Sequence, residues 1–167
     1  MKKLSLALTL APLLPFSACG GDPVGKDAAS YYNQMTPALE QNMALAQQFL
    51  EIAALVRKEE LQGDKLVKLW KSDIMPTADE LLADAKAIEP ATPQLSELHL
   101  ALIDAWDDRA RSYHDMYSAW EKSDTTAFAR AQQANVQAKL AEERYFQDVN
   151  ALLDPYGYHL DQFPQSE

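Results

Sequence analysis

The sequence has 167 residues and a formal net charge of −10, and 47% of its residues are hydrophobic. With 24% charged residues, this composition is that of a globular domain and excludes a chain that is disordered throughout. Five glycines are too few for the many tight turns of an all-β fold. The single cysteine excludes an internal disulfide and a cysteine-rich metal site. The length predicts one domain with its own core.

The first 18 residues have the three-part pattern of a secretory signal. Two lysines follow the initial methionine, a mainly apolar run covers residues 4–16, and small residues follow at positions 17 and 18. The run is shorter than the roughly 20 residues of a membrane-spanning helix, and prolines interrupt it. We therefore expect residues 1–18 to be removed as a signal peptide.

The end of this segment resembles the lipobox of bacterial lipoproteins, in which small residues precede an invariant cysteine. The match is carried by Ser17, Ala18 and Cys19, the only cysteine of the chain. The resemblance implies cleavage before Cys19 and attachment of lipid to its thiol, which would otherwise be open to oxidation in an exported protein. Because Gly20 rather than an aspartate follows the cysteine, the resemblance favours the outer membrane. The alternative is a plain signal peptide with an incidental cysteine.

The charge balance bears on what the mature chain can bind. Without the two lysines of the signal, 13 basic and 25 acidic residues remain, and the net charge becomes −12. So acidic a body has no electrostatic attraction to nucleic acid or to an anionic membrane surface. We therefore expect the lipid to provide the attachment, and residues 19–26, rich in glycine, to form a flexible linker.

Apolar residues recur at spacings of three and four between residues 27 and 154, a pattern that is typical of amphipathic helices. Proline, glycine and capping residues divide this stretch into four long segments. The dividing residues are Gly63-Asp64, Glu89-Pro90 and Ser123-Asp124, and Asp154-Pro155 ends the last segment.

Prolines inside two segments predict irregular helices. The first helix is expected to begin at Pro37, or near Asp27 with a bend at Pro37. Pro76 interrupts the second, and a capping-box pattern follows at Thr77–Glu80, so we expect a kink or two shorter helices end to end. Short connections force neighbouring helices to run antiparallel. The predicted fold class is therefore all-α, an up-down-up-down four-helix bundle over residues 27–154 with a kinked second helix.

Two stripes of apolar residues define much of the predicted core. In the first helix the stripe is Tyr32, Met35, Leu39, Met43, Ala46, Leu50, Ala53 and Val56. In the last helix it is Phe128, Ala131, Ala134, Ala138, Ala141, Tyr145, Val149 and Leu152. The alanines of the last stripe would let a neighbouring helix approach closely.

Arg109 is the one charged residue on the apolar stripe of the third helix, between Trp106 and Tyr113. Counting residues outward from the turns places Asp73 and Glu51 at about the same height. Because an unpaired buried charge is costly, we predict that Arg109 forms a structural pair with Asp73 or Glu51 near the kink. The functional alternative is a binding pocket at the kink.

No motif in the sequence predicts catalysis. Glu-x-x-His pairs, His-Glu-x-x-His, Gly-x-Ser-x-Gly and glycine-rich phosphate loops are all missing from the sequence, so we expect no enzyme and no cofactor. His99 and His114 are expected at the surface or its boundary. The acidic pair Glu142-Glu143 is expected on a solvated helix face. The aromatic tail, residues 155–167, is expected to fold back over the membrane-proximal end of the bundle.

Together these features predict a lipid-anchored bacterial envelope lipoprotein that is not an enzyme. We expect it to act as a protein-binding or accessory module whose partner is another envelope protein, at the periplasmic face or the cell surface. The alternative is a carrier that holds a small apolar ligand or haem between its helices.

Overall fold

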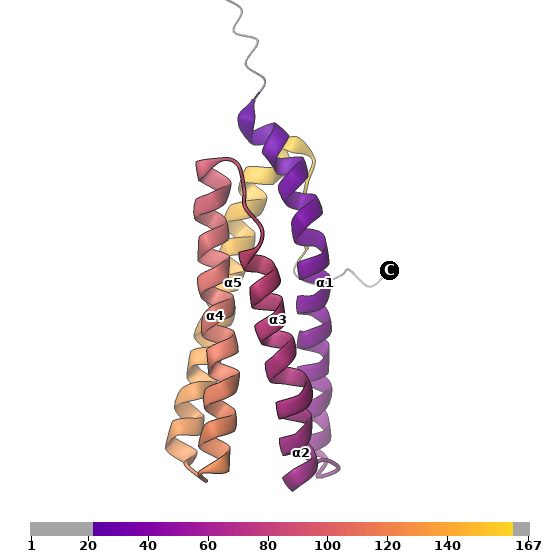
Figure 1. Cartoon of the computed structure of the whole chain (residues 1–167), viewed down its shortest axis with the longest axis vertical. Helices are drawn as coiled ribbons and strands as arrows, with labels where there is room; N and C mark the ends of the chain where they lie inside the picture. Colours follow the sequence, from indigo (N-terminus) through magenta and orange to yellow (C-terminus); the bar gives the residue numbers. More distant parts are fainter. Residues whose placement is uncertain (1–21, 162–167) are drawn as a thin grey trace, which may run out of the picture.

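The computed structural model describes residues 22–161, and in this part of the chain all regular secondary structure is helical and there is no strand (Figure 1). The predicted all-α class and its four long helical stretches are confirmed. The elements in chain order are α1 (Pro23–Arg57), α2 (Gly63–Leu69), η1 (Trp70–Ile74), α3 (Met75–Lys86), α4 (Pro93–Glu121), α5 (Thr125–Leu153) and η2 (Asp154–Tyr156). The predicted signal peptide and Cys19 lie outside the described residues.

Helix α1 begins earlier than either predicted start. The Asp22 side chain accepts a hydrogen bond from the backbone N–H of Val24 at 3.0 Å, and Pro23 occupies the first helical position, where it has no N–H to leave unpaired. Residues 23–26, predicted as linker, therefore form the first turn of a helix. Pro37 lies inside this helix rather than at its start.

The predicted stripe of α1 is correct at Met35 and Leu39 and is displaced by about one position elsewhere. Leu50, predicted in the core, is 62% exposed. The residues that are buried on this helix are Asp27, Ala28, Tyr31, Met35, Ala38, Leu39, Asn42, Leu45 and Ile52. The buried stripe thus passes through the polar residue Asn42, which a purely apolar pattern rejects.

Helices α4 and α5 form the most extensive helix–helix contact of the molecule. Of the alanines predicted to line α5, Ala131 and Ala138 are buried, and their small side chains allow a neighbouring helix to approach closely, whereas Ala134 is exposed. Helix α3 packs against both α1 and α4. Figure 1 shows these helices side by side along one long axis, with the start of α1 at one end and α2 at the other.

The second helical stretch is continuous from Gly63 to Lys86 but contains one π-helical turn, η1. The N–H of Met75 reaches back five residues to the carbonyl of Trp70, which widens the helix directly before Pro76. Because the helix does not restart, no side-chain cap forms at the beginning of α3, and the predicted capping box is not used.

The chain after α5 returns along the bundle. Tyr158 packs against Tyr32 with ring centroids 5.4 Å apart, and Leu160 is buried. The side chain of Asn150 binds the backbone of Leu160 twice, accepting from its N–H at 2.8 Å and donating to its carbonyl at 2.9 Å. The described part of the tail therefore folds back against α1 and α5, as its aromatic content predicts.

Candidate functional site

Arg109 of α4 lies in the centre of a buried polar cluster, with only 5% of its surface exposed. Its Nη1 is 3.0 Å from Oε2 of Glu142 on α5, and its Nη2 donates to the amide oxygen of Asn42 on α1. The guanidinium also lies 5.6 Å from the ring centroid of Trp106. The charge is thus neutralised by a partner from one neighbouring helix and hydrogen bonded to another.

Glu142 is the acceptor that gathers these donors. Its Oε1 accepts from the indole Nε1 of Trp106 at 2.8 Å and from Nδ2 of Asn42 at 2.7 Å, in addition to Arg109. Such multiple hydrogen bonding compensates a carboxylate for the loss of water. The cluster links α1, α4 and α5 at one level of the molecule.

The predicted partners of Arg109 were wrong. Glu51 is exposed and accepts from Gln47, and Asp73 lies on η1 outside the cluster. Two effects explain the error. Side chains of a helix tilt toward its N-terminus, so the Arg109 guanidinium lies about one turn nearer that end than counting of Cα positions indicates. In addition, α1 ends at Arg57 rather than at the glycine used for counting, which moves the partner on α1 toward its N-terminus.

Glu142 was also predicted incorrectly, because it is 2% exposed rather than solvated. The sequence contains a signal that could have identified it. Residue 142 lies four positions after Ala138 and three before Tyr145, both of which are buried on α5. Glu142 therefore belongs to the inward stripe, and pairing the buried Arg109 with the acid on the neighbouring stripe would have found it.

A second buried cluster connects the helices nearer the start of α1. The His99 Nε2 is 2.9 Å from the carbonyl oxygen of Ala85, which can only accept, so Nε2 carries the proton. Nδ1 then accepts from the Tyr31 hydroxyl at 3.0 Å, and Tyr31 accepts from the Tyr145 hydroxyl at 2.7 Å. This chain joins α5, α1, α4 and α3.

Burial controls the ionisation of this second cluster. It raises the pKa of the Tyr31 and Tyr145 hydroxyls, so both remain protonated. It also lowers the pKa of His99 below the usual 6.5, because the charged ring would lose hydration. His99 was predicted near the surface but is 2% exposed, whereas His114 is exposed as expected and lies 3.0 Å from Asp79.

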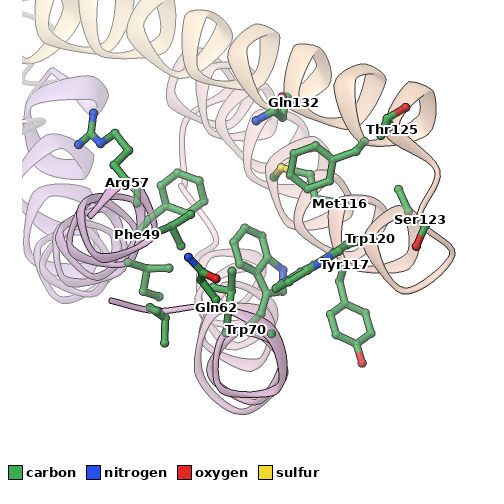
Figure 2. A pocket seen from close by; sticks show the side chains of 18 of the residues that line it. Phe49, Arg57, Gln62, Trp70, Met116, Tyr117, Trp120, Ser123, Thr125 and Gln132 are labelled. Atoms are coloured by element: carbon green, nitrogen blue, oxygen red, sulfur yellow. The ribbon is translucent and has the colours of Figure 1, made fainter. Parts of the chain in front are cut away.

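A cavity of about 790 Å³ lies at the end of the molecule where α1 meets α2 and α4 meets α5 (Figure 2). Its walls are mainly apolar and aromatic. They include Phe49, Leu61, Leu66, Trp70, Met116, Trp120 and Phe128. Neither buried polar cluster contributes a lining residue, so both clusters hold the helices together while the cavity is the accessible site.

Trp70 is held in place at the wall of this cavity. Its indole Nε1 donates to the backbone carbonyl of Tyr113 at 3.0 Å, and its ring packs edge to face on Phe49 with centroids 5.7 Å apart. Tyr113 completes a three-ring cluster, 5.5 Å from Phe49 and 6.0 Å from Trp70. This wall of the cavity is therefore formed before any ligand binds.

The connection between α1 and α2 brings further side chains to the cavity. Glu59 has a positive φ of 61°, and the N–H groups of Glu60 and Leu61 both bind the carbonyl of Leu55, which turns the chain back. Gly63 has a φ of 55°, a conformation that glycine adopts without strain. As a result Leu61 and Gln62 line the cavity.

The cavity departs from the predicted pocket in two respects. It includes Trp70 of η1, near the predicted kink, but not Arg109. It is also unsuited to haem, because its lining contains no histidine or cysteine and offers Met116 as its single sulfur ligand. Among residues 22–161, no group of three or more metal-binding side chains comes together.

No protein-family model, curated protein sequence or solved structure matches this chain. Within the described part of the chain, none of the helices combines the length and apolar character needed to cross a bilayer.

Replacing Arg109 tests the first polar cluster. We expect Arg109→Met to lower the free energy of unfolding by about 3–5 kcal/mol, because the Glu142 charge stays buried without its partner. Glu142→Gln in the same chain should recover part of this loss, since a neutral amide still accepts from Trp106. Urea unfolding measures both. Equal or lower stability of the double variant would contradict a buried ion pair.

The buried His99 predicts a pH dependence of stability. In the unfolded chain His99 is protonated below about pH 6.5, whereas in the folded protein burial resists this protonation. The free energy of unfolding is therefore unaffected by His99 above pH 6.5 and falls as the pH drops below that value. Between about pH 7.5 and about pH 5.5 the wild type should therefore lose more stability than His99→Gln. The exposed His114→Gln is the control and should behave like the wild type. Equal losses in all three proteins would refute the role of His99.

Proposed function

We propose that this protein is a non-enzymatic, lipid-anchored lipoprotein of the bacterial envelope whose helical domain binds a small apolar molecule. The observation that carries the proposal is the cavity of about 790 Å³ with its aromatic walls. This volume lies within the range of about 300–1,000 Å³ that is usual for small-molecule sites, which are mostly apolar with a few polar groups. The aromatic cluster around Trp70 gives the cavity a preformed wall.

We further propose that the four helical stretches form an up-down-up-down bundle with a kink in the second stretch. The short connection from Lys122 to Asp124 and the extensive contact between α4 and α5 support antiparallel neighbours. The π turn before Pro76 supports a change of direction at η1. The cavity then occupies the end of the bundle away from the start of α1.

Attachment through Cys19 would hold the start of α1 close to the membrane. Asp22, the cap of α1, follows Cys19 by three residues, a reach of roughly 10 Å when extended. Helix α1 is 35 residues long, or about 50 Å at 1.5 Å per residue. In this proposal the cavity opens well away from the bilayer, on the aqueous side of the membrane that carries the anchor, with the outer membrane favoured.

Binding of another envelope protein is a second candidate function. Val136 and Leu140 lie one turn apart on α5 and are 51% and 39% exposed, so they form an apolar strip on the outer face of that helix. Paired exposed apolar side chains of this kind occur at protein contacts.

The cavity predicts binding of a neutral apolar probe. We expect N-phenyl-1-naphthylamine to gain fluorescence when mixed with the protein, because the aromatic walls exclude water from it. Ala53→Phe fills part of the cavity and should weaken binding roughly tenfold or more. Ala101→Phe, on the exposed face of α4, is the matched control and should bind as the wild type does. A wild type that leaves the probe dim would exclude this function.

The lipid anchor is tested separately. Cys19→Ser should move the protein from the membrane fraction to the soluble fraction of bacterial cells, because several acyl chains are needed for stable anchoring. Mass spectrometry of the wild type should detect the acyl chains on the N-terminal cysteine. A mature N-terminus at another residue, or continued membrane association of Cys19→Ser, would show that the thiol is not the anchor.

A further inference from the structure

We propose that the ligand of the cavity is an uncharged amphiphile, an apolar body that carries a hydroxyl, ester or amide head, and that the amide of Gln62 selects the head. This inference rests on the proposed binding function and names the class of molecule that the same cavity accepts.

The charge distribution along the chain is the first argument. The two segments that surround the cavity, residues 49–70 and 116–132, contain six basic and six acidic side chains and are neutral overall. The remainder of residues 22–161 contains seven basic and 18 acidic side chains. The strong negative charge of the protein is therefore absent from the end that holds the cavity, and neither an anion nor a cation is attracted there.

The ionisable side chains of the lining give no fixed counter-ion. They are Arg57, Glu59 and Asp124, which carry both signs. The Asp124 carboxylate is already engaged as the cap of α5, where it accepts from the N–H of Ala127 at 2.9 Å. In Figure 2 the guanidinium of Arg57 points away from Phe49 and Trp70. A charged head entering the cavity would lose hydration, and the ionisable side chains of the lining are exposed ones rather than buried counter-ions.

The neutral polar groups of the lining are suited to an uncharged head. Figure 2 shows the Gln62 amide between Phe49 and Trp70, and Gln132 contributes a second amide from α5. An amide can both donate and accept, so it pairs with a hydroxyl or a carbonyl without requiring charge. Gln62 is itself exposed, so its amide lies at the solvent edge of the cavity, where a hydrogen bond to it distinguishes the head groups of molecules whose apolar body lies inside.

Three compounds that share a twelve-carbon chain and differ in the head group test this inference. The Cys19→Ser chain is used, so that no detergent competes for the cavity, and each compound displaces N-phenyl-1-naphthylamine. Monododecanoylglycerol, which is uncharged, should bind at least about tenfold more tightly than dodecanoate or dodecyltrimethylammonium. Affinities for either ionic compound that equal or exceed that of monododecanoylglycerol would overturn the inference.

A pair of matched variants tests the role of Gln62. Gln62→Leu should weaken binding of monododecanoylglycerol about three- to tenfold, the effect of one neutral hydrogen bond, and leave binding of the naphthylamine probe unchanged. Gln133→Leu, on an exposed position of α5 outside the lining, should change neither. An unchanged affinity in Gln62→Leu would overturn the selection by this amide. If the wild type fails to bind even the probe, the proposed function itself fails, whereas probe binding without head-group discrimination leaves that function in place.

Discussion

The arrangement of three helices depends on the buried carboxylate of Glu142. Glu142 accepts hydrogen bonds from Arg109, Trp106 and Asn42, and these residues come from two helices other than its own. Apolar side chains can be satisfied by more than one packing arrangement, but a charge in the interior is satisfied only where its partners lie. This cluster therefore fixes the height of α1 and α5 relative to α4. The chain from Tyr145 through Tyr31 to His99 adds a second fixed level nearer the start of α1.

These two levels explain how the protein can keep a cavity open at one end. Small apolar residues are buried along α5, and Leu95, Leu102 and Leu153 fill the interior away from the cavity. At the other end, large rings hold the walls apart: Trp70 is anchored to the backbone of Tyr113 and braced by Phe49. The buried polar clusters fix the helix register, and the aromatic residues at the other end form the cavity. Because different residues carry the two roles, substitutions in the lining need not disturb the register.

The helices were predictable from the sequence because their apolar spacing and their proline and glycine boundaries are local properties. On α4 the inward positions predicted at Trp106, Arg109 and Tyr113 are all buried. What failed was non-local. Glu142 was expected on a solvated face and Asn42 was not in the predicted stripe of α1, because each is polar when considered alone, but in the structure the two are buried and hydrogen bonded to each other. The start of α1 was missed because Gly25 suggested a linker, whereas in the structure the ring of Tyr156 packs over this glycine. The cavity depends on the conformation of the connection formed by residues 58–62, and the spacing of apolar residues does not predict the conformation of such a connection.

The π turn at η1 has a consequence for how the second helical stretch is shared between core and cavity. Leu66, Trp70, Ile74 and Ala78 follow one another at intervals of four, and in a regular α-helix each such step would rotate the next side chain by about 40° away from the last. The wider π turn compensates for this rotation, as a single inserted residue would. The side chains of α2 and α3 are consequently offset in rotation about the axis of one continuous helix. The side chains of α2 that line the cavity and those of α3 that fill the interior are therefore oriented separately, although they belong to one continuous helix.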